Sequence, residues 1–350
     1  MSPLHRNFAL AGGLGIILLA AACGGDGTGP GNGNPGTTAA KLEALDDPFD
    51  TPTFLSFRLA AGFTPVASAS LSDLRAAMSA VQAGPGIQPA VSFLRHTLDR
   101  RSVAGSAMFL PPEILGKTYE WNAVSGTYEA TTRLGAPANG VRFILYALGG
   151  TGLPATPLQE IGYADLKDES TPGLEKLHIV VVANGTTYVD YTIAVDTATS
   201  SFTMVGFVSD GSRRLDFGLT LSGTTNGTTT VISEEMTFDI DAENAHVRLT
   251  ATAEFLSETS YRTTLDYRLQ FGADVVTLAG IVSFNGSVVT GGFTMTLNGR
   301  DIATFTYNDA GGQWSRPGGG ALSQDDLQAV AAIVAAAGNL GLQLTDLLLL

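Results

Sequence analysis

The sequence is poor in the residues that build covalent cross-links, metal centres and catalytic sites. Cys23 is the only cysteine, so no disulfide can form within the chain. There are four histidines, and the three that follow residue 22, His96, His178 and His246, lie far apart along the chain. They lack the spacing of a zinc site, and no nucleophile-elbow sequence accompanies them. We therefore expect a protein that is not an enzyme and has no metal or cofactor.

Positive charge is also scarce. The chain has 19 Lys and Arg side chains against 33 Asp and Glu, which gives a formal net charge of -14 at pH 7. Such a surface repels the phosphate backbone of nucleic acids. We therefore expect no nucleic-acid partner.

The central part of the chain has the residue pattern of β-strands. With 44% hydrophobic and only 15% charged residues, the chain can bury a core. From Lys117 to Tyr307, polar and apolar residues alternate in short runs, which predicts about thirteen strands. The runs are separated by dipeptides that favour tight turns: Ser125-Gly126, Asn184-Gly185, Asp210-Gly211, Asn226-Gly227, Asn285-Gly286 and Asn298-Gly299.

This pattern predicts a mainly β fold with flanking helices: a large antiparallel β meander, as a curved sheet or half-barrel, packed against N-terminal and C-terminal helices. A β-sandwich is the alternative. One run has apolar residues that alternate with polar ones: Val247, Leu249, Ala251, Ala253 and Phe255. One face of the sheet should therefore be buried and the other exposed to solvent.

Helical patterns flank the strands. Within a short helical segment at residues 39–110, apolar spacing predicts helices near 71–81 and 89–98. The β domain should then span 111–310. In the last segment, 311–350, a loop precedes a helix at 324–337 that is apolar all round, and we expect that helix to be buried.

The β region contains an internal echo. Asp190-Tyr191-Thr-Ile193 recurs 76 residues later as Asp266-Tyr267-Arg-Leu269. The segment Phe217-Gly-Leu-Thr-Leu-Ser-Gly223 recurs at the same offset as Phe293-Thr-Met-Thr-Leu-Asn-Gly299. The echo suggests that a three-strand unit is duplicated at 187–223 and 263–299. A shared β composition is the other explanation.

The first 22 residues have the three parts of a secretory signal. Residues 1–6 carry a positive patch, residues 8–22 are apolar, and three alanines precede Cys23. Fifteen apolar residues are fewer than the ~20 that a membrane-spanning helix needs. We therefore interpret residues 1–22 as a leader.

The end of this leader, Leu19-Ala20-Ala21-Ala22-Cys23-Gly24, resembles the lipobox of bacterial lipoproteins. The resemblance implies cleavage between Ala22 and Cys23 and a diacylglycerol on the Cys23 thiol. It departs from the commonest pattern because Leu lies one place further from the cysteine, with Ala20 in its stead. Residues 23–38 would be the lipidated cysteine and a flexible Gly/Pro-rich tether. Gly24 replaces the Asp that retains enterobacterial members in the inner membrane, which implies the outer membrane.

Two interpretations of the folded body remain open. The first is a structural or protein-interaction module of the cell envelope, held at the membrane through the lipid on Cys23 and meeting another envelope protein. The alternative is a periplasmic carrier or binder of a lipid or other apolar ligand. Trp121, Tyr119 and Tyr128 could form a surface for sugar or peptide, but cross-strand packing is the simpler interpretation. The acidic stretch at 165–170 is interpreted as a solvated turn rather than a calcium loop.

Overall fold

The computed structural model describes residues 49–64, 108–196, 198–226, 229–240, 244–257, 260–286, 288–308, 311–324, 326–327, 330–331, 333 and 347. Ala22, Cys23, the Gly/Pro-rich tether and the two helices expected near 71–81 and 89–98 lie outside these residues.

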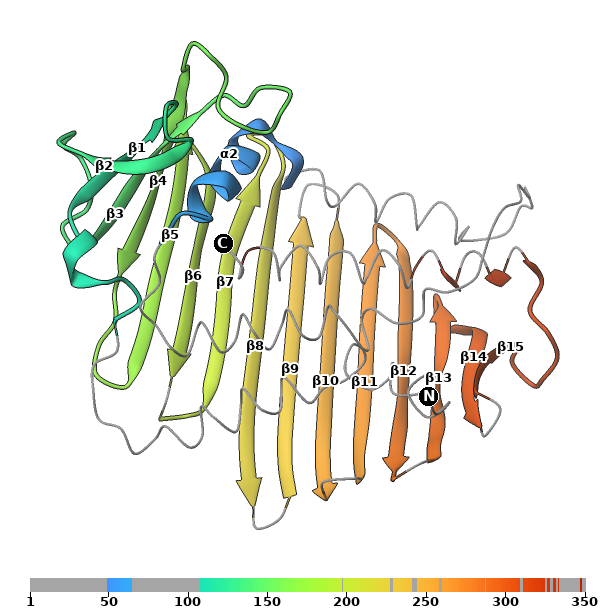
Figure 1. Cartoon of the computed structure of the whole chain (residues 1–350). Coiled ribbons are helices and arrows are strands. Elements are labelled where there is room, and N and C mark those ends of the chain that lie inside the picture. The colour runs from blue at the N-terminus through green and yellow to red at the C-terminus, as the bar shows by residue number, and fades with distance from the viewer. Residues whose placement is uncertain are drawn as a thin grey trace, which may run out of the picture. The chain divides into compact units, whose positions relative to one another are not determined.

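The described chain is mainly β, as expected from the sequence (Figure 1). One α-helix, α2 (Pro52–Ala61), and a 3-10 turn, η5 (Pro112–Ile114), precede the strands. The first strands are β1 (Lys117–Asn122), β2 (Thr127–Thr131), β3 (Gly140–Tyr146), β4 (Glu160–Asp168), β5 (Leu174–Ala183), β6 (Thr186–Asp196), β7 (Ser201–Ser209) and β8 (Arg214–Asn226). They are followed by β9 (Thr229–Ile240), β10 (Ala245–Ser257), β11 (Ser260–Phe271), β12 (Asp274–Asn285), β13 (Val288–Leu297), β14 (Arg300–Asn308) and β15 (Gly311–Ser315).

All fifteen strands belong to one open sheet in the order β15-β14-β13-β12-β11-β10-β9-β8-β7-β6-β5-β4-β3-β1-β2. From β3 to β15 the order follows the chain, as in the expected meander. The sheet is mixed rather than wholly antiparallel, because β1 pairs in parallel with β3, with Lys117 opposite Val141. The hairpin partner of β1, β2, therefore lies at the sheet edge. Alternating residues predict a strand but not the strand with which it will pair. The parallel pairing of β1 with β3 was therefore not predicted from the sequence.

The described residues divide into two compact units, with the boundary inside β8 after Gly218. The N-terminal unit contains α2, β1 to β7, the first part of β8 and Leu347. The C-terminal unit contains the rest of β8, β9 to β15 and the described residues of the final helix up to Ile333.

In the N-terminal unit, α2 covers part of the apolar sheet face. The helix begins at a Thr-Pro pair: the Thr51 hydroxyl accepts a hydrogen bond from the Phe54 amide, and Pro52 occupies the first turn, where no amide is needed. Phe54 and Phe57 are almost completely buried, and the helix contacts β3, β4 and β6. Strand β5 shows the expected alternation, with every second residue buried.

The C-terminal unit has a less regular division between faces. Along β10, Val247 and Phe255 are buried, but Leu249, Ala251 and Ala253 between them are only half-buried. The expectation of one buried face along the whole strand is therefore wrong at its centre, where these three side chains are less fully covered.

The final helix also differs from expectation. Helical backbone is described at several positions between Gln324 and Ile333, where Val330 and Ile333 are buried. Leu327 is 39% exposed, so the helix is not buried all round. Leu327 lies in the first turn, whereas the two buried residues lie further along and three positions apart, on one helical face.

Candidate functional site

Of the three aromatic residues predicted near the first hairpin, Trp121 and Tyr128 belong to the core, whereas Tyr119 is half-buried and stacks on Phe143. Trp121 and Tyr128 are each 7% exposed, and their ring centroids are 5.6 Å apart across the β1–β2 pair. Phe63, just after α2, packs against both rings. The Tyr128 hydroxyl donates a hydrogen bond to the Ile144 carbonyl over 3.0 Å. These contacts agree with cross-strand packing and leave little ring surface for a sugar or peptide.

The acidic stretch interpreted as a solvated turn instead begins inside β4. Asp165 and Asp168 are both buried. Asp165 lies opposite Arg142 on β3 and accepts two hydrogen bonds of 2.7 Å from its guanidinium. Asp168 accepts a hydrogen bond from the Leu110 amide. The prediction of a solvated turn was wrong because the acidic residues alone do not show that Arg142, on the neighbouring strand, neutralises the Asp165 carboxylate.

Arg142 is held from two sides. Its guanidinium carbon lies 3.8 Å from the centre of the Tyr163 ring, a cation–π contact, while Asp165 binds its nitrogen atoms. The hydrogen bonds from Arg142 to Asp165 hold the pKa of the arginine above its usual value. This arrangement is a satisfied charge cluster, and it stabilises the β3–β4 pair.

His178 on β5 lies between two carboxylates. Its Nε2 atom is 2.8 Å from Asp190 on β6, and its Nδ1 atom is 3.3 Å from Glu169. Lys176 also binds Glu169 at 2.7 Å, and this contact contributes most to lowering the pKa of the glutamate. His246 in the C-terminal unit has a similar carboxylate partner, Asp239, at 2.6 Å.

Carboxylates hold both histidines: the ring of His178 is hydrogen-bonded to Glu169 and Asp190, and the ring of His246 to Asp239 and Asn244. Within the part of the chain that the structure describes, no group of three or more His, Cys, Asp or Glu side chains is placed to hold a metal ion.

A different arrangement occurs on the apolar face of the C-terminal unit. In the register of β9, β10 and β11, Glu234 lies opposite Ala251, which lies opposite Leu265. Thr263 lies two residues before Leu265 on β11, and Tyr267 lies two residues after it. Because alternate residues of a strand share a face, these side chains and Glu234 lie on one face of the sheet. We call Glu234, Thr263 and Tyr267 the inner polar group.

Among the described residues, buried hydroxyls without a hydrogen-bond partner occur in both units, and Thr118 and Ser200 are examples in the N-terminal unit. Within the described part of the chain, the buried hydroxyls of Tyr267 and Thr263 have no hydrogen-bond partner. Burial raises the pKa of Tyr267 well above its ordinary value, so the group remains a protonated donor. Burial also raises the pKa of Glu234, although part of this side chain still reaches solvent.

The inner polar group was not predicted from the sequence, although a signal was present. Along β9, Glu234 stands in step with Ile232, Met236, Phe238 and Ile240, and this alternation places a carboxyl on the apolar face. A single charged residue within an apolar period of two is the pattern that could have identified it.

The two edges of the sheet are the other exposed feature. Strands β2 and β15 end the strand order, and within the described chain each has one strand neighbour. Glu129, Ala130 and Thr131 on β2 are exposed, as are Gly312 and Gln313 on β15. Backbone groups on such an edge can pair with an added strand.

Searches for related proteins add no family to this description: no protein-family model, no curated protein and no solved structure matches the chain. Among the described residues, no helix has the length and apolar character required to cross a membrane.

Proposed function

We propose that the protein is a lipid-anchored, non-enzymatic component of the cell envelope that acts as a protein-interaction module. The observation that carries the proposal is the open sheet, whose edge strands β2 and β15 expose backbone and side chains. An extended segment of a partner can pair with such an edge through main-chain hydrogen bonds. The paired charges around Arg142 and His178 support a structural role for the polar residues of the N-terminal unit.

The anchoring part of the proposal rests on the lipobox resemblance at residues 19–24. Lipid on Cys23 would hold the body at the outer membrane, and the Gly/Pro-rich residues after it would act as a tether. Metabolic labelling with a fatty-acid analogue tests this point. We expect wild-type protein to be labelled and to sediment with membranes, whereas Cys23→Ser should lose both properties. Equal labelling of the two proteins would contradict the anchor.

Site-specific photo-crosslinking in intact cells tests the interaction part. A photoreactive side chain would be placed at Ala130 on β2 or at Gln313 on β15, with Val205 as the control. Val205 is 58% exposed but lies on β7, away from the sheet edges. We expect a discrete adduct from at least one edge position and none from Val205. An adduct from Val205 with silent edge positions would contradict an edge-mediated interaction.

A further inference from the structure

Strand β15 ends the sheet (Figure 1) and lacks the features that usually protect an edge. Its sequence, Gly-Gly-Gln-Trp-Ser, has no charged residue and no proline. Natural proteins place such residues on free edges, because the backbone of an edge strand can pair with a strand of another chain. Gly312 and Gln313 are exposed, and among the described residues no turn or loop forms a backbone hydrogen bond with β15. A further strand can therefore pair with this edge.

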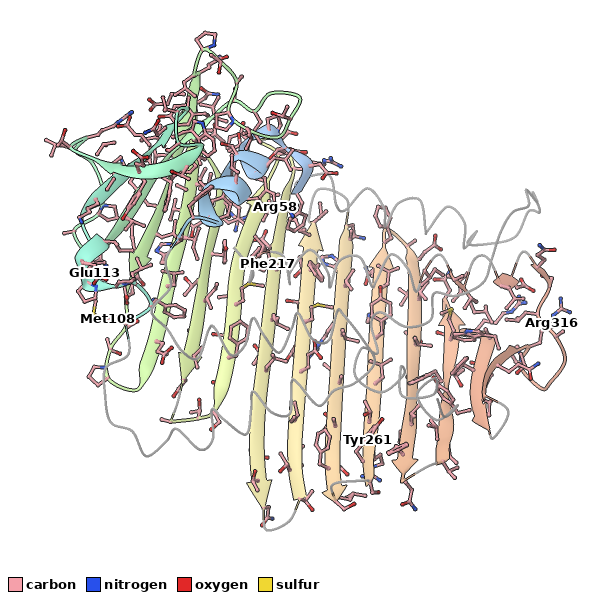
Figure 2. The ribbon with its side chains drawn as sticks, in the orientation of Figure 1. Arg58, Met108, Glu113, Phe217, Tyr261 and Arg316 are labelled. Atoms are coloured by element: carbon pink, nitrogen blue, oxygen red, sulfur yellow. The ribbon has the colours of Figure 1, made fainter. Side chains whose placement is uncertain are left out.

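The region around β15 is also poor in charge. Strand β13 has no charged residue, and the charged residues of β12 and β14 stand at the starts of those strands: Asp274, Arg300 and Asp301. Arg316, labelled in Figure 2, follows β15 and forms an ion pair of 3.5 Å with Asp326. The whole chain has a formal net charge of -14, so two copies repel each other least where their surfaces are uncharged. This edge therefore suits a second copy of the chain.

The sequence of β15 is complementary to itself. When two copies of the strand pair antiparallel about a two-fold axis at Gln313, Gly312 of each copy lies opposite Trp314 of the other. Trp314 is half-buried against Phe305, with ring centroids 5.0 Å apart, and the Phe305 ring also covers Gly312. An indole arriving opposite Gly312 would therefore meet an aromatic ring. An aromatic side chain beside an edge glycine is a favourable cross-strand arrangement.

The same pairing is unfavourable at the other edge of the sheet. The middle residue of β2 is Glu129, so two copies paired about the centre of β2 would place two carboxylates opposite each other. Hydrogen bonds from the Ser125 hydroxyl and the Asn122 amide hold the pKa of Glu129 below its usual value, so the group stays charged at neutral pH. Strand β2 therefore does not suit a second copy paired about its centre.

We propose that two copies of the protein pair through their β15 strands, so that their sheets continue into each other across a two-fold axis. This inference rests on the proposed function and names the partner of one edge as a second copy of the chain. Both copies use the same surface, as in most homodimers. Because β15 is only five residues long, the pairing is weak in dilute solution, and lipid on Cys23 favours it by holding both copies at one membrane.

Cysteine crosslinking of the full-length protein in its own membranes tests the pairing. Residues opposite each other in an antiparallel pair have Cβ atoms about 4.5–5.5 Å apart, close to the span of a disulfide. We expect Gln313→Cys to give a disulfide-linked dimer after mild oxidation with copper phenanthroline. Ala130→Cys, exposed on β2, is the matched control, and the wild type measures any background from Cys23. A dimer yield from Gln313→Cys no greater than that from Ala130→Cys would overturn the proposal.

A charge exchange tests the position of the axis. Gln313 is exposed, so Gln313→Glu and Gln313→Lys should both keep the fold. Each should weaken self-association about fivefold, the equivalent of one unfavourable cross-strand pair, because like charges would face each other at the axis. An equal mixture of the two variants should form mixed dimers in native mass spectrometry of the detergent-solubilised proteins. If the mixture forms no more dimer than either variant alone, the axis does not lie at Gln313 and the proposal fails.

The photo-crosslinks at the sheet edges separate this proposal from the proposed function. A photoreactive side chain at Gln313 should give an adduct with twice the mass of the protein. An adduct of another mass at Gln313, or an adduct at Ala130 alone, would overturn the pairing of two copies and leave the edge-mediated interaction standing. Silence at both edges would contradict both.

Discussion

Tyr191 and Tyr267 occupy equivalent positions in the internal echo, yet their hydroxyls have different surroundings. Both side chains are buried, at 2% and 5% exposed. The Tyr191 hydroxyl donates a hydrogen bond of 3.1 Å to the Leu347 carbonyl within the N-terminal unit. The Tyr267 hydroxyl in the C-terminal unit has no hydrogen-bond partner among the residues that the structure describes. The same residue in the same sequence context is therefore satisfied in one unit and unsatisfied in the other.

The contrast extends to the charged residues. In the N-terminal unit, the buried carboxylates of Asp165 and Asp168 have hydrogen-bond partners. In the C-terminal unit, Glu234 lies on the apolar face, and burial alone raises its pKa. The contrast concerns these particular residues, because among the described residues buried hydroxyls without a partner occur in both units, at Thr118 and Ser200 as well as at Thr263 and Tyr267.

The two tryptophans allow each unit to be followed separately, because Trp121 lies in the N-terminal unit and Trp314 in the C-terminal unit. Replacing either one by Phe leaves a fluorescent reporter in the other unit. Urea unfolding of such single-tryptophan proteins measures the free energy of unfolding unit by unit.

The largest expected effect tests whether the final helix belongs to the core of the C-terminal unit. Ile333 is 1% exposed, so Ile333→Ala should lower the free energy of unfolding reported by Trp314 by about 3 kcal/mol. Leu327→Ala is the control, because Leu327 is 39% exposed and should change the same quantity by less than about 1 kcal/mol. Equal effects of the two substitutions would show that this helix is not packed as described.

The next effect concerns the paired charges of the N-terminal unit. Asp165→Ala leaves the Arg142 guanidinium half-buried without its carboxylate, which should cost about 2–3 kcal/mol in the transition reported by Trp121. Asp216→Ala removes the partner of Arg214, a pair that is largely exposed, and should cost no more than about 1 kcal/mol. A loss for Asp165→Ala as small as that for Asp216→Ala would contradict the stabilising role of the cluster.

Acid and base should affect the two units in opposite directions. The pKa of Glu169 is lowered by Lys176, so its contribution to stability is present above the unfolded-state pKa and is lost as pH falls through the folded-state pKa. The pKa of Glu234 is raised by burial, so the folded state binds this proton more tightly than the unfolded chain does. Its unfavourable contribution is therefore absent at low pH and grows as pH rises from the unfolded-state pKa to the folded-state pKa.

Glutamine substitutions separate these two contributions. At pH 8, Glu234→Gln should raise the free energy of unfolding of the C-terminal unit by about 1.4 kcal/mol for each unit by which burial raises the pKa of Glu234. Near pH 3, the same substitution should leave the free energy of unfolding unchanged. Glu169→Gln should weaken the acid dependence of the N-terminal unit. Unfolding curves between pH 3 and 8 measure both effects, and a Glu234→Gln protein with wild-type stability at every pH would contradict the burial of that carboxyl.

Much of the fold could be predicted because it depends on local signals. Positive backbone φ angles occur at Asn184 and Gly185, and again at Asn298 and Gly299, as the turn dipeptides predicted. The first strand begins at Lys117, where the period of two begins. The parallel pairing of β1 with β3 could not be read in this way, because it depends on where the chain returns after residue 131.

The candidate site was harder to predict than the fold. Helix α2 lies within the segment at residues 39–110 that was predicted to be helical, but its own start at Thr51-Pro52 was not predicted, because the stronger apolar periods lie further along that segment. Glu234 has a signal in the alternation of β9, but nothing in the sequence states that Tyr267 lacks a partner while Tyr191 has one. That distinction depends on Leu347, which is 156 residues from Tyr191 along the chain.

The pair Tyr191→Phe and Tyr267→Phe tests the central comparison most directly. Each substitution deletes one hydroxyl from a buried ring and leaves the ring in place. The free energy of unfolding of the N-terminal unit should fall by about 1 kcal/mol for Tyr191→Phe, because a buried hydrogen bond is lost. For Tyr267→Phe, the free energy of unfolding of the C-terminal unit should stay the same or rise by up to about 1 kcal/mol, since an unpaired hydroxyl is removed. A fall of about 1 kcal/mol for both variants would contradict the account, because it would mean that the Tyr267 hydroxyl is already satisfied in the folded protein.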